Sequence, residues 1–206
     1  MGRELRVIDP DFPYHVITKG NNAEALVYDS LDVELLLHDL GQVATKYRWE
    51  VWAWCLMTNH FHVVVKTLDG ALSRGMQELN GNHSRRMNRR HGRSGHLVRN
   101  RFFSGIVDSD VYAVSSVVYV VWNPVKAGLC KTPADWPACS YRATVGLEPA
   151  PPWLAVDAVL ALFGRDKETA IRRYAEYVHS GRVPVSDTIE EVSRFEPAPP
   201  APGAAA

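Results

Sequence analysis

The sequence predicts an α+β fold, in which a four-stranded antiparallel sheet carries two helices on one face in the split βαβ, or ferredoxin-like, order. Short segments show the alternation or the branched and aromatic residues typical of strands, and longer ones show the helical period. Their order is strand, helix, strand, strand, helix, strand, with a further helix after them. A chain of 206 residues with 46% hydrophobic content can bury such a core.

The first half of the chain supplies three strands and one helix. Residues 14–19 alternate apolar and polar side chains, and a Gly-Asn-Asn run ends the pattern. Residues 30–47 repeat apolar side chains at helical spacing, and Asp32 lies where a carboxylate stabilises the start of a helix. The strands expected at 49–56 and 61–67 are rich in aromatic and branched residues and form a hairpin.

The second half begins with a helix at 72–88, where apolar side chains recur on one face and arginines crowd the last turn. A glycine-containing loop then leads to a fourth strand at 101–107. The segment 110–126 predicts a further helix, with an acidic residue at its start.

The composition changes after residue 146, where a proline-rich linker begins, and two short amphipathic helices are expected beyond it, at 153–163 and 167–180. The final run of proline and alanine cannot bury a core. We therefore expect a main domain at 1–147, a helical extension at 148–195 and a disordered tail at 196–206.

Two histidines flank one phenylalanine in the run 57–62, Met-Thr-Asn-His-Phe-His. Residues two apart on a strand share a face, so His60 and His62 point the same way while Phe61 points to the other side. Two imidazoles so placed can bind one divalent cation. Taken alone, the pattern fits a solvated strand face better than a metal site.

A second pattern lies on the helix expected at 110–126. Tyr119 and Asn123 are four residues apart and therefore project from one helix face. The phenol of Tyr119 and the amide oxygen of Asn123 would then face the same neighbouring group or ligand. Without other information, a buried tyrosine and an asparagine that begins a turn before Pro124 explain the pattern better.

Arginines concentrate in one segment of an otherwise acidic chain. The whole sequence has 23 basic and 23 acidic residues, but the segment 74–101 has a single acid, Glu78, and a local charge of +7. Its arginines are Arg74, Arg85, Arg86, Arg89, Arg90, Arg93, Arg99 and Arg101. Such a patch is typical of phosphate binding, because arginine binds phosphate with two parallel hydrogen bonds. The alternative is an arginine-rich helix end that only meets solvent.

Other classes of protein are disfavoured. No apolar run approaches the roughly 20 residues that span a bilayer, and the first residues lack the apolar core of a signal peptide, so a cytoplasmic protein with no membrane partner is expected. Cys55, Cys130 and Cys139 form no Cys-x-x-Cys pair and are interpreted as reduced thiols.

Taken together and in order, the motifs of the segment 14–146 resemble those of the HUH single-tyrosine transposases, and most closely the REP-associated tyrosine transposases. The motifs that carry the resemblance are Tyr14-His15-Val16 with Gly20-Asn21, Met57-Thr58-Asn59-His60-Phe61-His62, Leu72-Ser73-Arg74-Gly75-Met76, Asn88-Arg89-Arg90-His91-Gly92, Gly95-His96-Leu97 with Arg101-Phe102, Tyr119 through Leu129, and Ser140-Tyr141-Arg142-Ala143.

The resemblance implies the same fold and a strand-transfer reaction on single-stranded or hairpin DNA. His60, His62 and Asn123 would hold one Mg²⁺ or Mn²⁺, and imidazole ligands favour manganese. Tyr119 would be the nucleophile, and its phenol, with an unperturbed pKa of about 10, would need activation. Attack would leave a 5′-phosphotyrosine and a free 3′-OH. The protein would act as a monomer or a homodimer.

Two positions depart from the family pattern. Thr58 stands where the family usually has proline, which alters a turn beside the expected metal site. Phe103 stands where the family usually has lysine, which removes one expected basic contact with DNA.

Two other functions stay open at this point. A hairpin-binding regulator would use the basic surface with little or no cleavage. A metal-dependent phosphodiesterase would activate water instead of Tyr119. We rank His15 as a structural histidine and place Tyr112 and Tyr141 well below Tyr119 as nucleophiles.

Overall fold

A computed structural model of the chain describes residues 8–181. The expected tail at 196–206 and the last part of the expected extension, 182–195, lie outside the described residues. The elements are β1 (Tyr14–Lys19), α1 (Ser30–Lys46), β2 (Trp49–Leu56), β3 (His60–Thr67), α2 (Leu72–Arg90), β4 (Phe103–Ile106), α3 (Asp110–Lys126), α4 (Tyr141–Thr144), α5 (Val156–Ala161) and α6 (Lys167–His179), with short 3₁₀ turns at Asn21–Ala23 and Pro133–Asp135.

The four strands form one antiparallel sheet in the order β2-β3-β1-β4. This is the order of the split βαβ plan, so the predicted fold class is confirmed. β3, which carries the histidines, is central, with β1 on one side and β2 on the other. Because β3 is covered on both faces, nearly all its side chains are buried, and its sequence shows little polar alternation.

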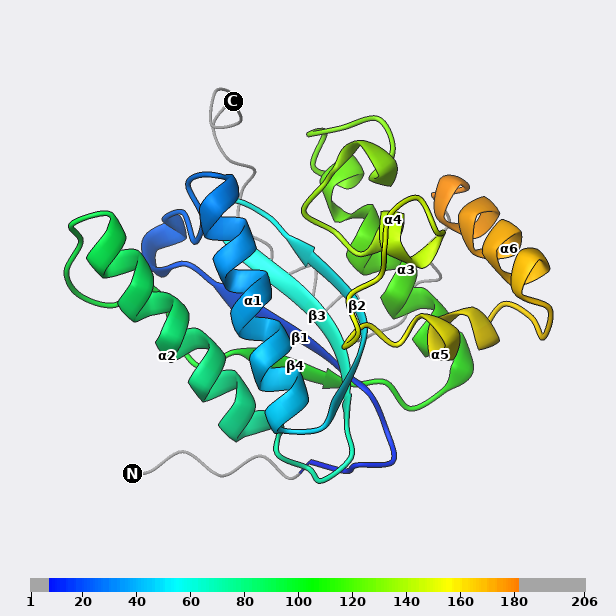
Figure 1. The fold of residues 1–206 in the computed structure, drawn as a ribbon, viewed down its shortest axis with the longest axis horizontal. Coiled ribbons are helices and arrows are strands. Elements are labelled where there is room, and N and C mark those ends of the chain that lie inside the picture. The colour runs from blue at the N-terminus through cyan, green and yellow to red at the C-terminus, as the bar shows by residue number, and fades with distance from the viewer. Residues whose placement is uncertain (1–7, 182–206) are drawn as a thin grey trace.

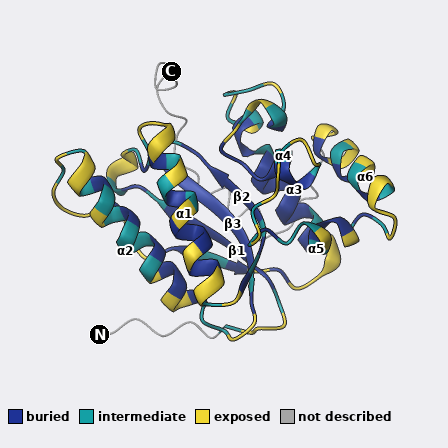
Figure 2. Ribbon diagram, in the orientation of Figure 1, coloured by how far each residue is buried: buried dark blue, intermediate teal, exposed yellow. Residues whose placement is uncertain are grey.

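The sheet has helices on both faces (Figure 1). α1 and α2 cover one face, where Val16, Phe61 and Val63 from the sheet join Leu40 and Met76 from the helices in one core. Figure 2 shows that these two helices turn buried residues toward the sheet and exposed residues outward. The two helices predicted on one face are therefore α1 and α2.

α3 packs on the opposite face, which sequence reasoning had placed only as nearby. Its Val117 and Val121 share a second core with Val64 of β3 and with Tyr174 and Val178 of α6. The extension therefore docks on the outer side of α3.

None of the helices within residues 8–181 combines the length and the apolar character of a membrane-spanning segment.

Two predicted elements are shorter than expected. The strand predicted at 101–107 is limited to Phe103–Ile106, because β4 is an edge strand that pairs only with β1. The helix predicted at 153–163 begins only at Val156. The preceding residues follow the edge of β2 instead, where the amide of Val51 donates to Trp153 O at 3.4 Å.

One close approach between a helix and the sheet can be tested. A Cβ atom added at Gly75 of α2 would lie 2.2 Å from the Trp49 ring, whereas one at Gly81 would meet only the flexible end of Arg85, at 3.3 Å. We expect Gly75→Ala to lower the free energy of unfolding by about 1–3 kcal/mol, because of overpacking. Gly81→Ala in the same helix should raise it by about 0.5–1 kcal/mol. Urea denaturation measures both, and equal effects would contradict the packing described.

Candidate metal and tyrosine site

The pairing of β1 with β3 gathers three histidines on the sheet face covered by α3. Ile17 lies opposite His62, and Lys19 lies opposite His60. Because side chains alternate, His60 and His62 face α3, while Phe61 enters the core beneath α1 and α2. His15, two residues before Ile17, faces the same side.

The imidazoles are linked to neighbours through one ring nitrogen each. His15 Nε2 lies 3.0 Å from His62 Nδ1, and His60 Nδ1 lies 2.9 Å from Asn59 Oδ1. The ring centroids of His60 and His62 are 5.0 Å apart. Within residues 8–181, the Nε2 atoms of both rings are buried and have no hydrogen-bond partner. A buried nitrogen without a partner carries a free-energy cost that a bound ligand would remove.

Burial keeps these imidazoles neutral. It lowers the pKa of His15 and of His60 to about 3, with the positive charge of Lys19 as a smaller cause for His60. Burial also lowers the pKa of His62 well below its ordinary value, and the neighbouring His60 contributes. A neutral imidazole is the form that binds a metal ion.

α3 brings Tyr119 and Asn123 to the same face of the sheet. The Tyr119 ring lies edge-on to His15 and His62, with centroid distances of 5.8 and 5.9 Å. Lys126 Nζ lies 5.0 Å from the centre of the Tyr119 ring. Asn123 Nδ2 donates to the main-chain oxygen of Tyr119 at 3.0 Å, so the amide oxygen is the atom of that side chain that could bind a cation.

The donor set suits a divalent cation. Two imidazole nitrogens without partners come from β3, and one amide oxygen comes from α3. Across the described part of the chain, no group of three or more His, Cys, Asp or Glu side chains could hold a metal ion. Asn123 as the third protein ligand therefore stays a prediction from the sequence.

Three of the eight arginines expected on DNA are engaged with α1 and the turn before it. Arg86 donates to Asp39 at 2.9 Å, and Arg90 donates to Asp29 at 2.8 Å and to the fully buried Asp32. The bond from Arg90 lowers the pKa of Asp29 to about 2. Arg93 pairs with Glu24. Part of the predicted basic patch is therefore neutralised by acids far away in sequence.

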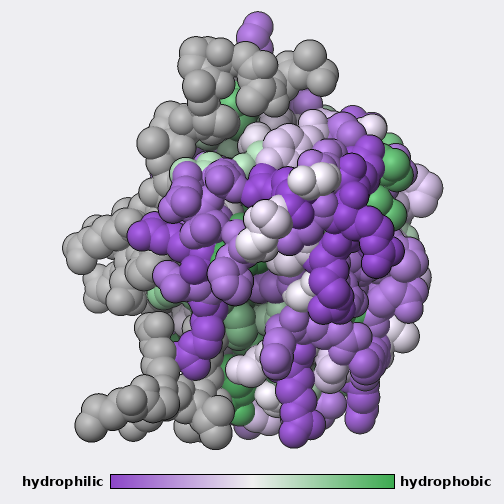
Figure 3. All heavy atoms as spheres, turned by 90° about the vertical axis from the view of Figure 1, so that its left-hand side faces the viewer, coloured by the Kyte–Doolittle hydropathy of each residue, from purple (hydrophilic) through white to green (hydrophobic). Residues whose placement is uncertain are grey.

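The other arginines lie differently. Arg74, Arg85, Arg89, Arg99 and Arg101 are exposed, and within residues 8–181 no ion pair involves Arg74, Arg85, Arg89 or Arg99. The face of the molecule that carries α2 is largely hydrophilic (Figure 3).

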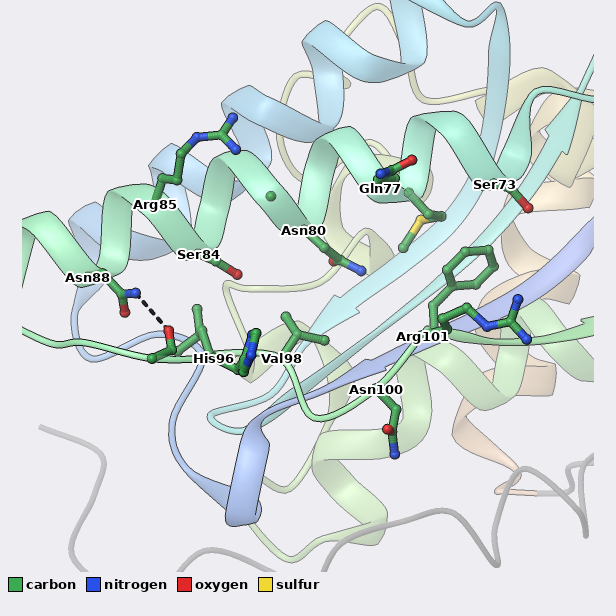
Figure 4. A pocket seen from close by; sticks show the side chains of 15 residues that line it. Ser73, Gln77, Asn80, Ser84, Arg85, Asn88, His96, Val98, Asn100 and Arg101 are labelled. Atoms are coloured by element: carbon green, nitrogen blue, oxygen red, sulfur yellow. Dashed lines mark hydrogen bonds between the residues drawn. The ribbon is translucent and has the colours of Figure 1, made fainter. Parts of the chain in front are cut away.

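A groove of about 690 Å³ runs between α2 and the segment 95–102. Asn80 and Ser84 of α2 point toward His96 and Val98 on that segment, and Asn88 Nδ2 donates to Gly95 O at 2.9 Å (Figure 4). The polar lining residues are Ser73, Gln77, Asn80, Ser84, Arg85, Asn88, His96, Asn100 and Arg101, and none of the described lining residues is acidic.

The groove and the histidines lie on opposite faces of the sheet at the same end of β1. The Thr18 hydroxyl donates to Asn80 Oδ1 in the groove at 3.3 Å. Next to it, Lys19 accepts a bond from the Arg99 amide at 3.0 Å and pairs with His60 in the sheet. The end of β1 therefore connects the groove on one face of the sheet with His60 on the other face.

The surroundings explain one of the two departures from the family pattern, Phe103, but not Thr58. The Thr58 carbonyl accepts from the Leu26 amide at 2.7 Å, a bond that a proline at 58 could also accept. Phe103 pairs with Ile17 and packs in a small core beside Tyr112, so an apolar contact stands where a lysine was expected.

Comparison of the sequence with known proteins identifies a family. A family described as "Transposase IS200 like" matches residues 10–120, which is more than half of the chain. The chain belongs to the IS200-like transposase family. The matched range contains His60, His62 and Tyr119 and ends before Asn123.

Among solved structures, this IS200-like chain is similar to a REP-associated tyrosine transposase bound to a REP hairpin. The two chains share 21% identity with a TM-score of 0.60, over 72% of this chain and 89% of the other, and this likeness shows the fold. A tRNA(His) guanylyltransferase from Saccharomyces cerevisiae matches at 13% identity and a TM-score of 0.43, over 95% and 85% of the two chains. No curated protein matches the chain.

Sequence reasoning missed several residues of this IS200-like site. His15 and Asn59 bond directly to the two histidines, and Lys126 lies over the Tyr119 ring. Asn59 lies inside the recognised motif at 57–62, where no role was assigned to it, and His15 was ranked as a structural histidine of the expected first strand. The missing information was which strand pairs with which, because that pairing decides what each imidazole meets.

The buried histidines predict a particular acid sensitivity of the metal-free protein. Their pKa values are lowered on folding, so the unfolded chain binds more protons than the folded one below pH 6.5. Stability should be complete above pH 6.5 and fall toward pH 3, by up to roughly 1.4 kcal/mol per pH unit for each group.

Replacement of one buried histidine measures its contribution to the pH dependence of stability. His15→Gln should reduce this slope by about one proton between pH 6 and 4, measured by urea denaturation with chelator present. An unchanged slope for His15→Gln would contradict the burial described.

Proposed function

We propose that this chain is a metal-dependent single-tyrosine DNA transposase that cleaves and rejoins single-stranded hairpin DNA of the REP type. One observation carries the proposal: the Tyr119 ring lies edge-on to His62, His62 lies beside His60, and the buried Nε2 atoms of these two histidines have no partner among residues 8–181. Membership in the IS200-like transposase family supports the reaction class. The hairpin in the related structure supports the choice of substrate.

His60, His62 and Asn123 supply the ligands for Mg²⁺ or Mn²⁺. When bound, that ion would neutralise charge on the phosphate oxygens and orient the leaving 3′ oxygen. The neutral state of the imidazoles keeps their lone pairs available at physiological pH.

Tyr119 performs the displacement. Its phenolic oxygen forms a bond to phosphorus as the bond between phosphorus and the 3′ oxygen breaks, and a proton passes from the phenol to solvent while the 3′ oxygen gains one. The products are a 5′-phosphotyrosine and a free 3′-OH. Attack by a 3′-OH on the phosphotyrosine reverses the step, so strands are rejoined without ATP.

The DNA is held by the α2 side of the molecule. Exposed Arg74, Arg85, Arg89 and Arg99 supply positive charge for phosphates. The amides and hydroxyls of the groove can bond to base edges or to phosphates. From there a strand can pass the end of β1, where Arg99 and Lys19 meet, and reach the histidines on the other face. Since the Tyr119 ring lies 5.9 Å from the His62 ring of the same chain, the site can be complete in a monomer or in each half of a homodimer.

A covalent adduct tests the nucleophile. We expect the unchanged protein to form a protease-sensitive adduct with labelled hairpin DNA and Mn²⁺, and Tyr119→Phe to form none, because the attacking oxygen is absent. Tyr112→Phe, on the same helix, is the matched control and should still form the adduct. Cleavage by Tyr119→Phe would indicate activated water, and binding without cleavage by the unchanged protein would indicate a hairpin-binding regulator.

Salt dependence of DNA binding separates two kinds of arginine on α2. Arg85 and Arg89 are exposed and one helical turn apart, so Arg85→Gln with Arg89→Gln should weaken binding and reduce the salt slope by about 1.5–2. Arg86→Gln removes the partner of Asp39, so it should lower the free energy of unfolding with little change in slope. Fluorescence anisotropy at several salt concentrations measures the slope, and identical slopes for all variants would contradict this assignment.

A further inference from the structure

Each of the two metal-facing histidines is held by a different neighbour through its Nδ1 atom. Asn59 Oδ1 lies 2.9 Å from His60 Nδ1, and His15 Nε2 lies 3.0 Å from His62 Nδ1. All four side chains are buried. A neutral imidazole carries one N–H, so these contacts decide which nitrogen of each ring keeps a lone pair.

The contact at His60 has only one consistent arrangement of hydrogens. Asn59 Nδ2 donates to the main-chain oxygen of Ala23 at 3.3 Å. A carbonyl oxygen can only accept, so the nitrogen of the amide must face Ala23 and the oxygen must face His60. Because that oxygen also can only accept, His60 Nδ1 must be the donor. The lone pair of neutral His60 is therefore on Nε2.

The contact at His62 has two possible directions. If His15 Nε2 donated to His62, the hydrogen of His62 would lie on Nε2, and this atom could not bind a metal ion. If His62 Nδ1 donates to His15 Nε2, the lone pair of His62 lies on Nε2, as in His60. Only the second direction gives the same role to the two Nε2 atoms, which have no partner among residues 8–181, and it places the hydrogen of His15 on Nδ1, which likewise has no partner there.

We propose that Asn59 and His15 are positioning residues, which accept the Nδ1 hydrogens of His60 and His62 and so direct both Nε2 lone pairs to one metal ion. This inference rests on the proposed metal-dependent function. The residues that usually accept such a hydrogen are carboxylates or main-chain carbonyls. Here both acceptors are uncharged side chains, so the pair of imidazoles is oriented without adding negative charge to the site.

The hydrogen positions can be measured before any metal is added. In protein with ¹⁵N-labelled histidine, long-range proton–nitrogen spectra of the metal-free form should show Nδ1 protonated and Nε2 unprotonated in both His60 and His62. His15→Phe should change the nitrogen shifts of His62 and leave His60 in this form. Asn59→Ala should do the reverse, so each variant provides the internal control for the other. Generic destabilisation would not produce this reciprocal pattern.

Metal affinity provides the second measurement. His15→Phe and Asn59→Ala should each weaken Mn²⁺ binding in titration calorimetry by about 10–100-fold. His15→Gln restores an acceptor and should recover part of the affinity. Ile17→Val removes a buried methylene from the same strand face without changing an acceptor, so it controls for packing and should bind Mn²⁺ normally.

The outcomes separate this inference from the proposed function. If the unchanged protein binds no Mn²⁺, the metal-dependent function fails, while the metal-free spectra still decide the hydrogen positions. If it binds Mn²⁺ and His15→Phe and Asn59→Ala bind equally well, the positioning role is overturned. A protonated Nε2 on His62 in the metal-free protein also overturns it.

Discussion

The strict alternation of side chains along β1 and β3 is the constraint on which the rest of this structure depends. In the observed register, Phe61 and Val63 complete the core beneath α1 and α2, and His60 and His62, which alternate with them, are forced to the face of α3. A shift of β3 by one residue would put two imidazoles into an apolar core and the side chains of Phe61 and Val63 against the tyrosine. The same hydrophobic pattern therefore determines both the register of the strands and the face on which the histidines lie.

Much of the fold could be predicted because strong local signals coincide with element ends. β1, β2 and α3 begin and end where periodicity predicts, although Ser109 caps α3 where Asp110 was expected to do so. Weaker elements were less predictable, since tertiary pairing decided them. The segment before α5 has helical periodicity, but its backbone groups are satisfied by the edge of β2. β4 is short because, among residues 8–181, it pairs with β1 alone.

The sequence showed which residue types could share a face in the candidate site. It did not show which side chains contact one another. Spacing alone showed that His60 and His62 share a face and that Tyr119 and Asn123 share another. It could not show that Arg86 and Arg90 turn toward acids some fifty or more positions earlier. Charge counted along a sequence overstates the charge that a ligand meets, because helix packing cancels part of it. The amides of the groove were likewise invisible, since asparagine and glutamine carry no charge to mark them.

α6 packs against the outer side of α3, so residues far from Tyr119 help to hold it in place. Tyr174 and Val178 are fully buried in the core that also holds Val117 and Val121, on the turns of α3 around Tyr119. A chain shortened before α5 would not be a smaller version of the same protein, because one side of α3 would lose its support. The phenol would then be supported only from the sheet, and the alignment needed for the proposed in-line attack would suffer although no residue of the candidate site had changed.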